Sequence, residues 1–204
     1  AAGGLVVCAV AGGYLLRSRD EQRVQRPKPA VAVDPSTLTS ERDVQWLSTA
    51  IERGQLDDAA EKYDLAAQLA QSAGAPARAS VAHSAGALVL ALRGKLDDAK
   101  KQLSAAEATQ GGDPSAAAYL DMATAEVSLA SGALDEAIAR STRCAKAFAT
   151  ISAELAATCH ELHGNAAADA GDLAAARAAY NEGLAVQPSE ARSITLRLAL
   201  VGLD

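Results

Sequence analysis

The chain has few aromatic residues, few cysteines and no excess of positive charge, and each shortage narrows the classes of protein to which it can belong. Only 3 % of its 204 residues are aromatic although 50 % are hydrophobic, so alanine supplies most of the apolar fraction. Alanine has the highest helix propensity, which favours closely spaced helices. A net charge of −6 argues against a nucleic-acid-binding surface, which needs clustered lysine and arginine. Three cysteines are too few for a dense disulfide framework.

Sequence motifs that carry catalysis are also missing. There is no Gly-x-Ser-x-Gly elbow, phosphate-binding loop, Gly-x-Gly-x-x-Gly or Cys-x-x-Cys. His160 and His163 lie three residues apart, but a zinc site needs a third protein ligand, so a metal-dependent enzyme is the least favoured interpretation. We expect no catalytic residue, cofactor, metal or small-molecule substrate.

Residues 1–16 form an uncharged, mostly apolar stretch. A helix of this length spans roughly 24 Å, slightly less than the hydrocarbon core of a bilayer. Because the sequence begins at Ala1 and not at methionine, we expect upstream residues that complete a single transmembrane anchor. The anchor residues are Leu5, Val6, Val7, Val10, Tyr14, Leu15 and Leu16.

Two alternatives to an anchor fit less well. A cleaved signal peptide carries its basic residues before the apolar stretch, whereas Arg17 and Arg19 follow it. A lipoprotein would be modified at Cys8, but Val6 and Val7 do not make a small-residue lipidation motif.

Residues 17–39 are expected to connect the anchor to a folded domain. The segment 17–28 is a basic collar, which by the positive-inside tendency suits a cytoplasmic domain. Only one flank of the anchor is visible, so the side of the membrane stays open. Three prolines within 27–39 predict an extended tether.

Four similar turns then recur along the chain. They begin at Gly54, Gly94, Gly132 and Gly171, in steps of 40, 38 and 39 residues, and an acidic residue follows each glycine within three positions. A fixed period in this range predicts an all-α solenoid of helix pairs, here over residues 40–188. The predicted helices cover 41–53, 56–72, 77–93, 96–110, 115–131, 134–149, 153–170 and 173–186.

A last helix over 189–201 should close the array, within a capping segment 189–204. Ile194, Leu198 and Val201 share one of its faces, and we expect this face to cover the last exposed apolar surface.

The fourth pair carries a recognisable pattern, formed by Gly164, Gly171, Ala176, Tyr180 and Pro188. This spacing resembles the tetratricopeptide repeat, and the earlier pairs keep parts of it. The whole architecture (one anchor, a tether, about four lengthened repeats and the final Leu-Arg-Leu-Ala-Leu-Val-Gly-Leu) is similar to the YfgM-type family. That resemblance implies a bacterial inner-membrane protein with a periplasmic repeat domain, ancillary to the SecYEG translocon and the periplasmic chaperone network.

Cys144 and Cys159 lie at about equal distances from the predicted turn at 150–152, on antiparallel helices. They can therefore face each other. Two readings stay open: a pair of buried thiols that act as small apolar groups, or a disulfide, which requires an oxidising compartment.

The resemblance implies that one face of each first helix lines a binding groove. Two interpretations stay open for its residues: contact with an apolar or basic partner segment or a partner helix, or packing between repeats. The groove residues include no lysine or arginine that could bind the C-terminal carboxylate of a partner. Aligning the repeats places on this face Val44, Ser48 and Ile51, then Val81, Ser84 and Leu88, then Tyr119, Met122 and Glu126, then Glu161, Asn165 and Asp169.

The sequence thus favours a non-catalytic, membrane-anchored scaffold whose partners are a membrane protein complex and other protein chains. We expect a single-pass protein of the bacterial inner membrane with its repeats in the periplasm. The alternative is a cytoplasm-facing assembly subunit of another membrane machine, such as a secretion, pilus or respiratory complex.

Overall fold

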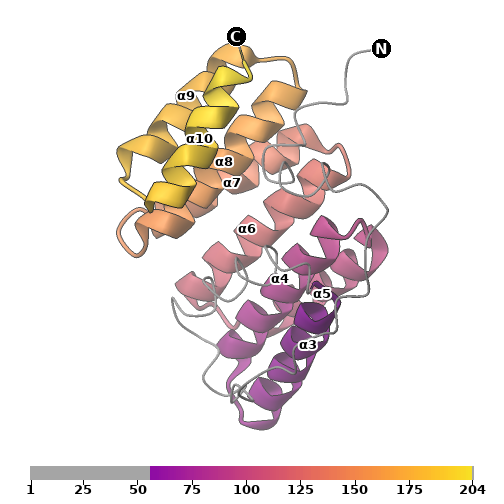
Figure 1. The fold of residues 1–204 in the computed structure, drawn as a ribbon. Helices are drawn as coiled ribbons and strands as arrows, with labels where there is room; N and C mark the ends of the chain where they lie inside the picture. The colour runs from indigo at the N-terminus through magenta and orange to yellow at the C-terminus, as the bar shows by residue number, and fades with distance from the viewer. Residues whose placement is uncertain (1–55, 204) are drawn as a thin grey trace, which may run out of the picture.

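The computed structural model describes residues 56–203, and within them the regular structure is entirely α-helical (Figure 1). Each of the eight helices begins and ends within one residue of its predicted bounds. The helices are α3 (Leu56–Ser72), α4 (Pro76–Leu92), α5 (Leu96–Thr109), α6 (Pro114–Ala130), α7 (Leu134–Phe148), α8 (Ala153–Asp169), α9 (Leu173–Ala185) and α10 (Glu190–Val201).

Residues 1–55 lie outside the described range. The predicted anchor, collar, tether and first helix (41–53) belong to this segment, together with Val44, Ser48 and Ile51. Among the helices that the structure does describe, none has the length and apolar character to cross a membrane.

The repeated glycines end their helices as the sequence predicts. Gly94, Gly132 and Gly171 have φ of 71°, 78° and 82°, the left-handed region that glycine adopts without strain. The amide after each glycine donates to a carbonyl five residues earlier, as Lys95 N does to Leu90 O at 2.9 Å. This is the Schellman arrangement, which satisfies the last carbonyls of a helix, so each turn is fixed locally.

The helices stack in chain order from α3 to α10 (Figure 1). Each helix packs mainly on its neighbours in sequence, except that α5 and α6 touch lightly and α4 packs closely against α6. The corresponding contact between α6 and α8 is much smaller, and α8 packs closely against α7 instead.

The central apolar cluster joins α4, α6, α7 and α8. It contains Leu88, Met122, Phe148, Leu155 and Cys159, all at most 8 % exposed. The fourth helix pair, α8 and α9, has a separate apolar cluster, in which Tyr180 packs against Ala176 and Leu196.

Gly164 lies in α8 directly under the ring of Tyr180. A Cβ at this position would meet Tyr180 Cε1 at 2.3 Å. The helices α8 and α9 can approach this closely only because residue 164 has no side chain, which explains the glycine of the sequence pattern.

The structure corrects an expectation about the apolar side chains of α10. Ile194, Leu198 and Val201 were expected to cover the array but are 50 %, 63 % and 70 % exposed. The other side of α10, with Leu196 and Ala199, packs on the fourth pair instead.

Candidate binding face

The predicted groove residues divide into a buried group and a partly exposed group. Ser84, Leu88 and Met122 are buried at 0 %, 8 % and 4 % exposure. The packing interpretation therefore applies to these three side chains. Val81, Tyr119, Glu126 and Asn165 keep partial access to solvent, Glu161 is buried and Asp169 is exposed.

Two of the partly exposed residues also support the packing of their neighbours. Asn165 Oδ1 accepts a hydrogen bond of 2.7 Å from the hydroxyl of Tyr180, which ties α8 to α9. The ring of Tyr119 packs edge-on against Phe148, with centroids 5.2 Å apart. The accessible face thus consists mainly of Val81 on α4, Tyr119 and Glu126 on α6, and the polar surface of α8.

A buried ion pair joins α8 to the capping helix α10, and the sequence reading did not foresee it. Arg192 donates from Nε to Glu154 Oε1 at 3.2 Å and from Nη1 to Glu161 Oε2. The backbone amide of Ser189 donates to the other oxygen of Glu154 at 3.0 Å. The side chain of Glu161 is 3 % exposed and that of Arg192 19 %. Arg192 lies 38 positions after Glu154 and 31 after Glu161, so no local sequence pattern could have indicated this ion pair.

Glu126 is enclosed by protein on most sides, although its side chain keeps partial access to solvent. Burial, reinforced by the negative charge of Glu161, raises the pKa of Glu126 from 4.5 to about 7. Burial likewise raises the pKa of Glu161, against the lowering effect of Arg192. The surroundings of both carboxyl groups therefore disfavour their charged forms, chiefly through burial.

These shifts predict that the fold loses stability as the pH rises. Between pH 4.5 and 7 the folded state binds more protons at Glu126 than the unfolded state, so the free energy of unfolding falls with pH. We expect E126Q to be more stable than the parent chain at pH 8, by roughly 1 to 3 kcal/mol, and to show a flatter profile. The measurement is urea unfolding at pH 5, 6.5 and 8, with E107Q, a change at an exposed glutamate of α5, as control. Parallel profiles for E126Q and the parent chain would contradict the assignment.

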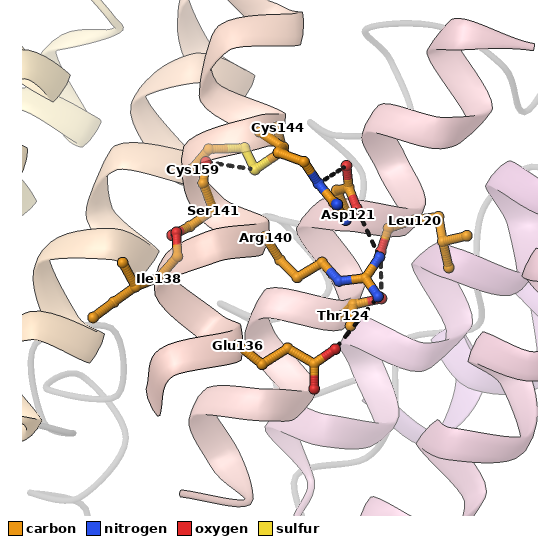
Figure 2. Close-up of polar contacts among 10 residues, drawn as sticks. Leu120, Asp121, Thr124, Glu136, Ile138, Arg140, Ser141, Cys144 and Cys159 are labelled. Carbon is orange, nitrogen blue, oxygen red and sulfur yellow. Dashed lines mark hydrogen bonds and ion pairs between the residues drawn. A yellow bond between two sulfur atoms is a disulfide. The ribbon is translucent and has the colours of Figure 1, made fainter. Parts of the chain in front are cut away.

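A second ion-pair cluster connects α6 to α7 (Figure 2). Asp121 accepts from Arg140 Nη1 at 3.0 Å and from Arg143 Nη2 and Nε at 2.6 and 3.1 Å. Arg140 also pairs with Glu136, one turn earlier. Its charges are matched within the cluster, so this group holds two helices together and offers no free charge to a ligand.

Cys144 on α7 and Cys159 on α8 are joined by a disulfide (Figure 2). Their Cα atoms are 5.9 Å apart, within the separation that a disulfide allows. Both residues are completely buried in the central cluster. The bond therefore connects the third helix pair to the fourth.

Of the two histidines considered for a metal site, His160 faces α9. His160 Nδ1 lies 3.3 Å from Glu182 Oε2, within ion-pair distance but outside hydrogen-bond geometry. Burial lowers the pKa of His160, against the raising effect of Glu182, and so disfavours the charged ring. Within residues 56–203, no group of three or more potential ligands (histidine, cysteine, aspartate or glutamate) is suited to a metal ion.

The remaining histidine, His83, belongs to a buried polar network that the sequence reading also missed. Its Nδ1 lies 2.6 Å from Gln102 Oε1 and its Nε2 lies 3.1 Å from Gln71 Nε2. Gln102 in turn donates to Asp64. With a hydrogen on Nδ1, the ring donates to Gln102 and accepts from Gln71, so the network ties α3, α4 and α5 together.

Comparison with known proteins agrees with this architecture. A family model described as a tetratricopeptide repeat-like domain matches residues 43–202. Neither the curated proteins nor the solved structures give a match to the chain.

Proposed function

Because the chain belongs to the tetratricopeptide repeat-like family, we propose that it is a non-catalytic scaffold that binds other protein chains. Domains of this family mediate protein–protein interactions. The observation that carries the proposal is the partly exposed face of the first helices, where Val81 and Tyr119 come from successive pairs. Apolar side chains that recur on successive first helices of a solenoid suit an extended or helical partner segment.

Site-specific photo-crosslinking tests this assignment. We expect a photoreactive phenylalanine analogue at Val81 of the full chain to crosslink to a small, reproducible set of proteins in cells. The same analogue at Ala139, exposed on the second helix α7, serves as the matched control and should give no such adducts. Identical adduct patterns at the two positions would contradict binding through the first helices.

For the finer role, we propose an ancillary subunit of a membrane protein complex such as the protein translocon, anchored by residues 1–16 and contacting clients or chaperones. The similarity to the YfgM-type family supports this role. The Cys144–Cys159 disulfide supports a periplasmic domain, because disulfides persist in oxidising compartments. The basic collar 17–28 favours the alternative, a cytoplasm-facing assembly subunit.

Trapping the thiols distinguishes the two compartments. Cells that express a C8A chain are quenched in acid and denatured in N-ethylmaleimide, and the protein is then reduced and treated with polyethylene glycol maleimide. A periplasmic domain should gain two polymer additions, because only disulfide-bonded cysteines escape the first reagent. A C8A/C159A chain should gain none. Absence of any addition to the C8A chain would contradict the periplasmic assignment.

A further inference from the structure

The outer side of the last helix, α10, carries large apolar side chains that stay exposed. Ile194, Leu198 and Val201 lie on this side, and each is at least half exposed. The opposite side of α10, with Leu196 and Ala199, packs on the fourth helix pair. Helix α10 lies at the end of the array farthest from α3 (Figure 1). A terminal helix of a solenoid normally presents a polar outer face, so this apolar one calls for a partner.

The same outer face of α10 carries one charge of each sign. Glu190 and Arg197 are exposed and lie seven residues apart, nearly two helical turns, so they share one edge of the face. Neither forms an ion pair or a side-chain hydrogen bond with another residue of 56–203. Ala191 and Leu198 are also exposed and seven residues apart, and they share the other edge. Ile194 lies between the two edges.

These positions make the face complementary to a second copy of itself. When two α10 helices pack face to face and antiparallel about a two-fold axis near Ile194, each edge meets the same edge of the other copy in reverse direction. Glu190 of each copy then lies opposite Arg197 of the other. On the second edge, the small side chain of Ala191 lies opposite the large one of Leu198. A parallel pairing would instead place the charged edge against the apolar edge.

We propose that α10 binds a second copy of this chain through its outer face, as an antiparallel two-fold dimer. Two Glu190–Arg197 pairs fix the antiparallel orientation, and the apolar side chains between and beside them supply the contact area. The helix has twelve residues and is roughly 18 Å long, so this interface is smaller than the roughly 1,600 Å² typical of stable complexes. The dimer is therefore weak and reversible.

Cysteine crosslinking of the full 204-residue chain in cells tests for this dimer. A C8A/I194C chain carries one thiol near the two-fold axis, since Cys144 and Cys159 are bonded to each other and completely buried. Cells are treated with a short bis-maleimide, quenched and analysed by denaturing electrophoresis without reductant. We expect a covalent homodimer. The matched control C8A/A139C, with its thiol at an exposed position of α7, should give at least about tenfold less dimer.

Charge exchange tests the antiparallel pairing. In the C8A/I194C background, E190R or R197E places like charges opposite each other at two points of the interface, and each should lower the dimer yield at least about fivefold. When the two variants are expressed together, one with a tag that changes its size, the mixed dimer should form again at close to the parent yield. Both contacts across the axis then join opposite charges. This recovery also shows that each variant is folded.

Two outcomes would overturn the proposal. If I194C gives no more dimer than A139C, another occupant (a different protein, membrane lipid or the chain's own residues 1–55) covers the face. If either charge variant alone keeps the parent yield, or the mixture shows no recovery, the antiparallel pairing is wrong. Among the described helices α10 contacts α8 and α9 but not α4, so photo-crosslinking from Val81 tests the scaffold function separately.

Discussion

Replacing Arg192 with alanine is expected to release the capping helix α10 and to lower the free energy of unfolding by roughly 3 kcal/mol. Arg192 is the cation that faces Glu154 and Glu161. Without it, Glu161 remains as a buried charge with neither of its oxygens paired, and removing one partner of a buried ion pair costs more than the pair contributed. Urea unfolding gives the stability, and hydrogen exchange of the amides of α10 reports the local release.

Two further variants isolate the cause. R197A removes an exposed arginine from the same helix and should change stability by less than about 0.5 kcal/mol. R192A/E161Q removes the buried charge together with its partner and should recover part of the loss. The loss in R192A should also be smaller at pH 5 than at pH 8, because burial raises the pKa of Glu161 and protonation neutralises it. A loss in R192A no larger than that in R197A would show that the ion pair does not hold α10.

G164A is expected to destabilise the fold by at least about 2 kcal/mol, even though alanine is the better helix former. The new methyl group would lie 2.3 Å from Cε1 and 2.5 Å from Cδ1 of Tyr180. The ring of Tyr180 is completely buried, and its hydroxyl is held by Asn165, so it cannot move aside without breaking other contacts. Thermal and urea unfolding measure the effect.

G86A provides the matched control, because Gly86 is also a buried glycine in the interior of a helix. The nearest atom to its added Cβ is Tyr63 Cβ at 3.6 Å, an ordinary contact. We expect G86A to be neutral or to stabilise by up to about 1 kcal/mol through helix propensity. In a Y180L background the cost of G164A should shrink, since the two positions are in contact. An undiminished cost in that background would show that the clash with Tyr180 is not its origin.

The helix bounds could be predicted because the signals that set them are local. Each glycine turn is closed by hydrogen bonds within six residues. At the start of three helices the N-cap side chain accepts a hydrogen bond from the backbone amide three residues later; these N-cap residues are Asp113, Ser152 and Ser189. The facing positions of Cys144 and Cys159 were also readable, because a short turn at 150–152 places them opposite each other, whereas the bond itself was one of two open readings. Local chemistry therefore determines both the elements and their pairing.

The orientation of α10 could not be read in the same way. The helix carries two apolar stripes, one with Leu196 and Ala199 and one with Ile194 and Leu198. Helical periodicity alone does not say which stripe faces the array. The ion pair between Arg192 and α8 selects the first stripe, and this contact spans more than thirty positions of sequence.

Which side chains of the first helices are exposed could not be predicted either, because this also depends on packing between helices distant in sequence. On α4, buried residues occur on nearly every side, including Ser84 and Leu88, because α3, α5 and α6 all pack on it. The contact between α6 and α8 is much smaller than that between α4 and α6, and Glu126 on α6 keeps partial access to solvent. The sequence repeats almost regularly, but the packing between successive pairs does not.

The covalent link between α7 and α8 determines how the array can come apart. In a solenoid each repeat is coupled mainly to its neighbours, so unfolding can stop at a weak boundary between repeats. The Cys144–Cys159 bond removes the boundary between the third and fourth pairs, whereas the second and third pairs are held together by non-covalent packing alone among the described helices. We therefore expect residues 114–203 to unfold as one cooperative block, with partial unfolding under oxidising conditions beginning on the N-terminal side of α6.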